Sequence, residues 1–339
     1  MFICQIIASH GDGGLEKHVR ELSSGLVAEG HRVLVVGDIA FTKTLAEGVE
    51  SVSLNMRLSR HHPWLLLQLY LCLRRYPFDV IHAQANKAAS MLAKVKWLLK
   101  PEAIATLHNV KSQFKVFQHF SNVICVSQYL ANQLKQPGVE VIYNGIQISS
   151  RVVPSIDLHQ QYTLPERNPT IIAVGRLVFA KGFDLLLEAI DGLDINLIIV
   201  GEGPERESLE QRIARLDQKT VARLIGHHDD PSKLMHAADG LVISSRREGF
   251  SYVLNEALMS GVNVLATDVP VANEVLPKPL IVPVGDVSIL RNRLQTLLHT
   301  PSYWSELMKK AQYYSKNEMT VEQMTRKTVK LYQRIIKAS

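Results

Sequence analysis

The chain has 339 residues, more than one ordinary core accommodates and about the length of two domains of roughly 150 residues each. Hydrophobic residues make up 46% and charged residues 21%, with 19 glycines and 14 prolines, so the composition excludes disordered and fibrous proteins. The net charge of +6 is uneven, because residues 1–150 carry 15 Lys and Arg against 10 Asp and Glu, whereas residues 151–339 carry 23 against 22.

The start of the chain, its apolar runs and its cysteines predict a cytoplasmic protein. Residues 2–7 have the pattern of a strand and lack the basic segment and cleavage site of a signal peptide. The longest apolar run, residues 64–73, is shorter than the roughly 20 residues that cross a bilayer. Cys4, Cys72 and Cys125 show no CxxC spacing, which argues against disulfides and zinc and favours a reducing compartment.

Short apolar runs alternate with helical patterns along the first half, as expected of βαβ units with a parallel sheet. A helix is predicted at residues 15–29, after the first strand. The predicted strands are residues 2–7, 33–36, 80–82, 103–107, 122–126 and 139–143. The alternation stops at residues 151–169, where three prolines indicate a linker between domains.

A second series of the same kind follows the linker. Its predicted strands are residues 170–174, 196–200, 222–225, 240–243 and 263–266. A last helical pattern, residues 320–337, has no strand after it. The fold class is therefore α/β, with Rossmann-like doubly wound parallel-sheet domains at residues 1–150 and 170–319, and such sheets bind ligands at the carboxyl ends of their strands.

A glycine turn follows the first predicted strand and feeds a helix. Glycines let the backbone approach a ligand closely, and helix N-terminal amides attract phosphate. The dinucleotide fingerprint GxGxxG is not met, because Gly11 and Gly13 are followed by Glu16 at the place of the third glycine. Asp38 at the end of the second strand would suit a ribose. A nicotinamide dehydrogenase and a tight turn without ligand remain alternatives for this segment.

Two cations follow the first strand of the second domain. Arg176 and Lys181 lie in the segment Val174-Gly-Arg-Leu-Val-Phe-Ala-Lys-Gly182. Positive side chains at a strand's carboxyl end suit a diphosphate, because they offset its charge without a metal. Surface charges without a ligand explain these two residues equally well when they are considered alone.

The segment 244–261 favours a diphosphate site over surface charges without a ligand. Ser251 is the predicted N-cap of a helix whose first amides, those of Tyr252 to Leu254, would bind a phosphate. Glu248 lies in the turn before the helix, and Glu256 follows it by eight residues, one turn into the helix. Carboxylates accept hydrogen bonds from sugar hydroxyls, so the segment suits a nucleotide sugar bound through its phosphates, ribose and hexose.

Together these motifs resemble a family-4 retaining glycosyltransferase of GT-B fold (glycosyl transferases group 1). The resemblance rests on Gly13-Gly14-Leu15-Glu16, Gly175-Arg176 with Lys181-Gly182, Gly201-Glu202-Gly203-Pro204, and Glu248-Gly-Phe with Glu256 in an E-x7-E pattern. It covers the whole chain in order and is strongest over residues 170–275. It implies two Rossmann-like domains facing a central cleft, with the last helix packed back on the first domain.

The resemblance also implies roles for individual residues. Arg176 and Lys181 would bind the donor diphosphate, Glu256 the ribose hydroxyls, and Glu248 the transferred sugar. The glycine turn would meet the donor phosphates, and the segment 223–226 would meet the base through its backbone. The implied donor-binding set is Gly13, Gly14, Arg176, Lys181, Gly201, Leu224, Ile225, Glu248, Gly249, Phe250, Ser251, Tyr252, Val253, Leu254 and Glu256. The implied catalytic set is His108, Glu248, Arg176 and Lys181.

His108 follows a predicted strand in Ala105-Thr-Leu-His-Asn109 and matches the family position near the reacting sugar. A structural histidine is the alternative. The chain departs from many relatives at Asp268-Val-Pro-Val-Ala-Asn-Glu274, which lacks paired glycines before the glutamate, so the donor sugar does not follow from this loop. No D-x-D triad for a metal-bridged diphosphate is present, and we expect no metal and no cofactor besides the donor.

Residues 57–115 contain ten Lys and Arg but only Asp79 and Glu102, which predicts an anionic partner. A phosphorylated or lipid-linked acceptor at the membrane surface is one interpretation, and charge for solubility is the other. The apolar run 64–73 is expected to be a core helix of the first domain rather than a helix that dips into a membrane. Low aromatic content, 6%, and the lack of a recognition module argue against nucleic acid.

The resemblance, together with the charge and the composition, therefore implies a cytoplasmic, metal-independent, retaining glycosyltransferase, peripheral on the inner face of the cytoplasmic membrane. Its donor would be a nucleotide sugar, with UDP favoured over GDP or ADP, and its acceptor a glycan or a lipid-linked molecule. Bacterial envelope polysaccharide or lipopolysaccharide synthesis is the expected setting. A nucleotide-sugar epimerase of the same fold and a non-catalytic nucleotide-sugar-binding protein are the alternatives.

Overall fold

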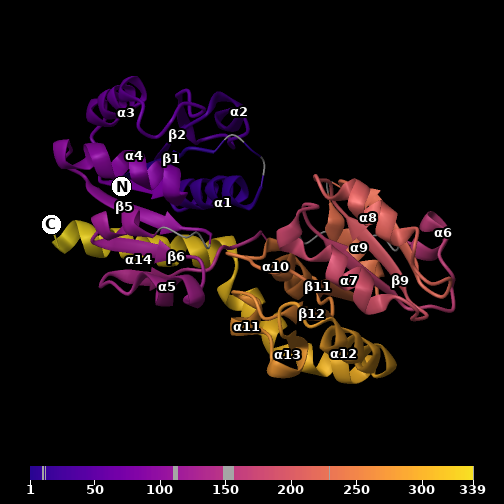
Figure 1. Ribbon diagram of the computed structural model, residues 1–339. Helices are drawn as coiled ribbons and strands as arrows, with labels where there is room; N and C mark the ends of the chain where they lie inside the picture. Colours follow the sequence, from indigo (N-terminus) through magenta and orange to yellow (C-terminus); the bar gives the residue numbers. More distant parts are fainter. Residues whose placement is uncertain (10, 12, 110–113, 148–155, 229, 339) are drawn as a thin grey trace. The chain divides into compact units, whose positions relative to one another are not determined.

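The computed structural model describes residues 1–9, 11, 13–109, 114–147, 156–228 and 230–338. The chain divides into two compact units, here called unit 1 (Met1–Gln147 with Glu318–Ser339) and unit 2 (Ile148–Asn317) (Figure 1). Residues 151–155 of the predicted linker lie outside the described residues, and its later part contains the short helix α6 (Leu158–Tyr162).

Unit 1 is built on a seven-stranded parallel sheet in the order β3-β2-β1-β4-β5-β6-β7. Its strands are β1 (Phe2–Ile7), β2 (Arg32–Gly37), β3 (Glu50–Ser53), β4 (Val80–Gln84), β5 (Glu102–Leu107), β6 (Asn122–Cys125) and β7 (Val139–Val141). The helices are α1 (Gly14–Ala28), α2 (Ile39–Thr42), α3 (Pro63–Arg75), α4 (Ala85–Val95), α5 (Gln128–Leu134) and α14 (Val321–Ala338), with 3-10 turns η1 (Lys96–Leu98) and η2 (Lys115–His119). The strand order reverses between β1 and β4, which is where open α/β sheets bind ligands.

Unit 2 has a six-stranded parallel sheet in the order β10-β9-β8-β11-β12-β13, whose order reverses between β8 and β11. Its strands are β8 (Thr170–Val174), β9 (Asn196–Val200), β10 (Val221–Gly226), β11 (Gly240–Ile243), β12 (Val264–Thr267) and β13 (Ile281–Val282). The helices after α6 are α7 (Phe183–Ile190), α8 (Arg206–Ile213), α9 (Pro231–Ala237), α10 (Tyr252–Met259), α11 (Ala272–Val275), α12 (Val287–His299) and α13 (Pro301–Glu318), with 3-10 turns η3 (Phe179–Lys181) and η4 (Lys278–Leu280).

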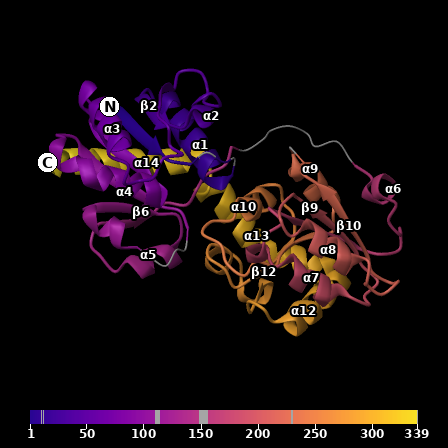
Figure 2. The same cartoon turned by 45° about the horizontal axis from the view of Figure 1, so that its top comes forward.

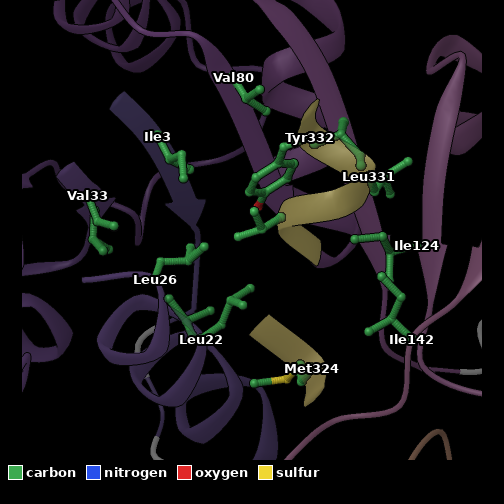
Figure 3. Close-up of a cluster of buried hydrophobic side chains, with 14 of the residues drawn as sticks. Ile3, Leu22, Leu26, Val33, Val80, Ile124, Ile142, Met324, Leu331 and Tyr332 are labelled. Carbon is green, nitrogen blue, oxygen red and sulfur yellow. The ribbon is translucent and has the colours of Figure 1, made fainter. Parts of the chain in front are cut away.

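The last helix, α14, is part of the core of unit 1. It packs against α1, and Figures 1 and 2 both show the two helices in this unit. Figure 3 shows Leu331 and Tyr332 of α14 within a cluster of buried side chains that also contains Ile3, Val80 and Ile124 from the sheet. α14 therefore contributes buried side chains to the core of unit 1, although it lies far from these strands in the sequence.

The predicted fold class is confirmed, and each predicted strand is present with ends that differ by at most two residues. Two edge strands have no counterpart among the predicted elements. β3 has the sequence Glu-Ser-Val-Ser and β13 has only two residues, so neither shows the apolar run by which a buried strand is recognised. The sheets are therefore one strand wider at one edge than the hydrophobic pattern indicates.

The prediction that residues 64–73 form a core helix is only half right. In α3, Leu65, Leu69 and Leu73 are buried, whereas Trp64, Leu67 and Leu71 on the opposite side are exposed. The helix is apolar on both sides, yet only one side meets the core. No helix formed by the described residues is long and apolar enough to span a membrane.

Candidate functional site

The predicted donor residues of unit 2 gather where the strand order reverses. β8 and β11 are parallel neighbours, and the loops that leave their carboxyl ends contain Arg176 and Lys181 in one case and Glu248 in the other. Parallel strands bring such loops to the same edge of the sheet. Residues more than 60 positions apart in the sequence are thereby placed next to each other.

Lys181 and Glu248 form the central contact of this edge. The Lys181 ammonium lies 2.6 Å from Glu248 Oε1, and the Ser245 hydroxyl donates to the same oxygen at 2.7 Å. The Glu248 side chain is 9% exposed and that of Lys181 22%, so both charges are largely removed from water and are compensated by each other. The site thus presents a cation and a hydrogen-bonded carboxylate side by side.

Arg246 holds the turn that carries Lys181. Its guanidinium makes two hydrogen bonds to the Asp184 carboxylate, at 2.7 and 2.8 Å, and its backbone amide donates to Ala180 O at 2.8 Å. The guanidinium also stacks on the Phe179 ring, with 4.0 Å to the ring centroid. The hydrogen bonds from Arg246 lower the pKa of the Asp184 carboxyl. Arg246 therefore ties the loop after β11 to the η3 turn.

Glycines at the carboxyl ends of β8, β9 and β10 let these strand ends approach each other closely. Gly201 has φ +150°, and a Cβ atom at this position would lie 1.9 Å from the carbonyl oxygen of Gly175. The Gly201 amide donates to the Gly226 carbonyl at 2.7 Å. Leu224 and Ile225, on the neighbouring strand β10, are half-buried. The backbones at the carboxyl ends of β8, β9 and β10 are thus in direct contact, and any side chain at position 201 would clash with them.

The remaining predicted donor residues of unit 2 are Arg176 and those at and just before the start of α10. The prediction that Ser251 is the N-cap is confirmed, because its hydroxyl accepts a hydrogen bond from the Leu254 amide at 3.3 Å. Of the other predicted donor residues here, Gly249 is buried, while Phe250, Tyr252, Val253 and Glu256 are half-buried. Arg176 is exposed, and within the described part of unit 2 it forms no ion pair.

Unit 1 has a pocket of about 460 Å³ at the carboxyl ends of β1, β4 and β5. It is lined by Ala8, Ser9, Gly14, Leu15, Glu16, Gln84, Ala85, Asn86, Lys87, His108 and Asn109. Gly13 is the extended N-cap residue of α1, and it lies close to the buried Glu16 carboxylate. The pocket therefore brings the start of α1 together with His108.

His108 is held in this pocket by two contacts. Its Nε2 lies 2.8 Å from Gln84 Oε1, and the His18 ring meets its ring edge to face with centroids 4.6 Å apart. Burial holds the pKa of His108 well below its ordinary value, so the ring is neutral near pH 7. Neither partner is among the predicted site residues, because the predicted strand 80–82 ends two residues before Gln84 and because no motif marks His18, which follows the glycine turn.

Two family descriptions match the chain, one for each unit. The family described as Glycosyltransferase Family 4 matches residues 12–150, and the family described as Glycosyl transferases group 1 matches residues 155–318. The two matches follow each other without overlap and leave only the first 11 residues, a short gap and the α14 segment outside.

Proteins of similar sequence are glycosyltransferases as well. A phosphatidylinositol N-acetylglucosaminyltransferase subunit of Homo sapiens is 28% identical over 308 residues, which is 80% of this chain, and the chain spans 62% of that protein's length. The lipopolysaccharide core biosynthesis glycosyltransferase LpsE of Rhizobium meliloti is 27% identical over 264 residues, 76% of each chain.

Among solved structures, Anabaena Alr3699/HepE in complex with UDP superposes with a TM-score of 0.83 and 22% identity, covering 98% of this chain and 100% of that one. The same protein has also been solved with UDP-glucose. With its two parallel-sheet units, its paired family matches and these relatives, the chain belongs to the group 1 glycosyltransferases of GT-B fold.

Proposed function

We propose that this glycosyltransferase moves a hexose from a nucleotide sugar to a glycan or lipid-linked acceptor with retention of anomeric configuration, in the synthesis of a bacterial envelope polysaccharide or lipopolysaccharide. The observation that carries the proposal is the Lys181–Glu248 pair beside the start of α10, within the group 1 match. UDP is the favoured nucleotide, since a structural neighbour of the chain was solved with UDP and with UDP-glucose.

The geometry of unit 2 suggests how the donor is held. Lys181, Arg176 and the first amides of α10 supply positive charge and N–H groups for the diphosphate. Glu248 is already fixed by two hydrogen bonds to Oε1 and would accept hydrogen bonds from hydroxyls of the transferred sugar. Glu256 would accept hydrogen bonds from the ribose hydroxyls. Cations and amides take the place of a bridging metal in this arrangement, so the proposed reaction proceeds with no metal.

For retention, we favour attack by the acceptor on the face from which the phosphate leaves, with the leaving phosphate accepting the acceptor's proton. Positive groups around the diphosphate stabilise the charge that develops on it as the glycosidic bond breaks. His108 is neutral, so its part in the reaction is to hydrogen-bond the sugar and not to add a charge. An acidic protein group is not required by this mechanism.

The donor is tested by thermal shift, measured without acceptor. The cognate nucleotide sugar, at about 100 times its dissociation constant, should raise the free energy of unfolding by about 2.7 kcal/mol, and the UDP, GDP and ADP sugars should separate clearly. Turnover is then followed with acceptor glycans, and the anomeric configuration of the product is read by NMR. An inverted product would contradict retention, conversion of the sugar without acceptor would indicate an epimerase, and donor binding without turnover would indicate a binding protein.

We also propose that unit 1 docks on an anionic membrane through the outer side of α3. Trp64, Leu67 and Leu71 are exposed along this side, which ends at Arg74 and Arg75. In Figure 1, α3 lies at the periphery of unit 1. An apolar stripe on a surface helix next to arginines is the composition that binds the interface of anionic lipid bilayers.

A second exposed tryptophan extends this surface. Trp97 is 75% exposed, and its indole N–H donates to Lys94 O at 2.8 Å. The Lys94 ammonium in turn lies 2.8 Å from Arg60 O and 2.9 Å from His61 Nδ1, just before α3 begins. Contacts therefore connect Trp97 to the start of α3, and both tryptophans belong to the basic segment 57–115.

The docking proposal is tested by co-sedimentation with vesicles of phosphatidylglycerol and phosphatidylcholine. Changing Trp64 to serine should lower the partition coefficient about tenfold, since about 1.4 kcal/mol of transfer free energy is lost. Raised salt should also weaken binding. Tyr313→Ser, which removes an aromatic residue that is 72% exposed on α13, is the control and should leave binding unchanged. Weak binding that responds to neither salt nor Trp64→Ser would contradict the proposal.

A further inference from the structure

A chain of buried polar side chains lies behind His108 and is not used by the proposed reaction. Gln84 accepts from His108 through Oε1 and donates to Gln5 Oε1 through Nε2, at 2.8 and 2.6 Å. The Gln84 amide nitrogen also lies 3.4 Å from the His82 ring. Each of these side chains is at most 5% exposed. Burying polar side chains costs free energy unless they are hydrogen-bonded, so a buried chain of this length indicates a specific role.

The chain continues to the last helix. His82 Nδ1 lies 2.6 Å from the Tyr332 hydroxyl of α14, and its Nε2 lies 2.6 Å from the Thr106 hydroxyl. Both nitrogens of His82 are therefore occupied, and burial lowers its pKa to about 3, so the ring is neutral. The His82 ring is neutral and is held at both nitrogens, so it restricts the position of the Gln84 amide that lies against it.

The amide orientation of Gln84 decides which nitrogen of His108 carries the proton. Its Nε2 faces Gln5 and the His82 ring, so its Oε1 faces His108 and can only accept. His108 must then be protonated at Nε2, which leaves Nδ1 as an acceptor for a ligand in the pocket that His108 lines. The tautomer is thus set by a side chain that lies behind the ring.

The backbone next to Gln84 is strained. Ala85 has φ +64°, the left-handed region that costs a residue with a Cβ atom about 1 kcal/mol or more. Ala85 also lines the pocket, directly after the last residue of β4. Strain of this kind persists where the surrounding structure requires a particular side-chain direction, and here it accompanies the turn by which Gln84 and the following residues reach the pocket.

We propose that Gln84 is a positioning residue for sugar transfer, which holds His108 as the neutral Nε2–H tautomer with Nδ1 available to a hydroxyl of the substrate. The His82 ring, which Tyr332 holds, lies against the Gln84 amide, so α14 supports the pocket through a series of buried polar contacts. This inference rests on the proposed function, in which His108 meets the transferred sugar.

Two substitutions of Gln84 separate positioning from packing. Gln84→Met keeps the size but removes the acceptor, and should lower kcat by up to about 100-fold with a small change in the donor KM. Gln84→Glu keeps an acceptor but places a carboxylate beside His108, which raises its pKa. Its activity should approach the wild-type value at pH 8 and fall as the pH is lowered to 6, over a range where the wild-type activity stays flat.

A readout without turnover distinguishes this inference from the proposed function. ¹⁵N NMR of the histidine rings should show His108 as the Nε2–H tautomer in the wild type and a mixed tautomer in Gln84→Met. Gln136→Met is the control, because it removes a half-buried amide that donates to Phe117 O and Phe120 O elsewhere in unit 1. An Nδ1–H tautomer in the wild type, or an unchanged tautomer and kcat in Gln84→Met, would overturn the inference even if sugar transfer is established.

Discussion

Replacing Lys181 with alanine is expected to lower kcat for sugar transfer by about 10²–10³-fold, the range for losing one preorganised group that stabilises developing charge. Lys181 lies at the reversal point of the unit 2 sheet and its side chain is only 22% exposed, so water replaces the lost ammonium poorly. Donor binding should weaken as well, because the diphosphate loses a cation in the ground state. Steady-state kinetics with a saturating acceptor and thermal shift with the donor measure the two effects separately.

The matched control is Lys309→Ala, which removes a lysine that is paired with Glu306 on the exposed surface of α13. It should leave kcat within a factor of about two, since exposed ion pairs contribute little. Glu256→Gln should abolish most transfer for a different reason, the loss of the carboxylate assigned to the ribose. Near-normal turnover in both Lys181→Ala and Glu256→Gln, with the fold intact by circular dichroism, would refute the site assignment.

That the predicted donor residues of unit 2 lie together could be predicted from the sequence, because the parallel sheet brings their loops to one edge. Once the strands at 170–174 and 240–243 are recognised, their carboxyl-end loops must lie at the same edge of a parallel sheet. Ser251 is likewise predictable as an N-cap, since capping depends on residues next to each other in the chain. Local pattern and sheet topology together bring Lys181 and Glu248 close without any knowledge of side-chain contacts.

The contacts within the site could not be predicted. Arg246 and Asp184 are 62 residues apart, and Tyr332 and His82 are 250 apart, and neither pair has a sequence spacing that marks it. Long-range side-chain pairs depend on how helices pack on the sheet, which hydrophobic periodicity does not specify. The outer side of α3 shows the same limit, because an apolar pattern on both sides of a helix does not reveal which side meets the core.

Acidification is expected to destabilise unit 1 well above the pH at which carboxylates are protonated. Burial lowers the pKa of His18 to about 4 and that of His82 to about 3, and it holds that of His108 well below its ordinary value. In the unfolded chain these rings bind protons with a pKa of about 6.5. Below that pH the unfolded state therefore takes up protons that the folded state excludes.

Because the unfolded state binds more protons, the free energy of unfolding falls as the pH falls, and the contribution of the neutral rings is complete only above about pH 6.5. Each buried histidine should contribute a slope of about 1.4 kcal/mol per pH unit below about pH 6, and about 2 kcal/mol of stability should be lost for each of His18 and His82 by pH 5. This is a large part of the roughly 5–15 kcal/mol that stabilises an ordinary domain.

Urea unfolding of the protein between about pH 7.5 and 5 measures this slope. Replacing His18 with glutamine removes one titrating ring and should reduce the slope by about one proton, whatever its effect on stability at the upper end of that range. His62→Gln is the control variant, because it removes an exposed histidine at the start of α3 that lies outside the buried cluster. Equal slopes in the wild type and His18→Gln would mean that His18 is protonated in the folded state, and the neutral histidine cluster around His108 would have to be abandoned.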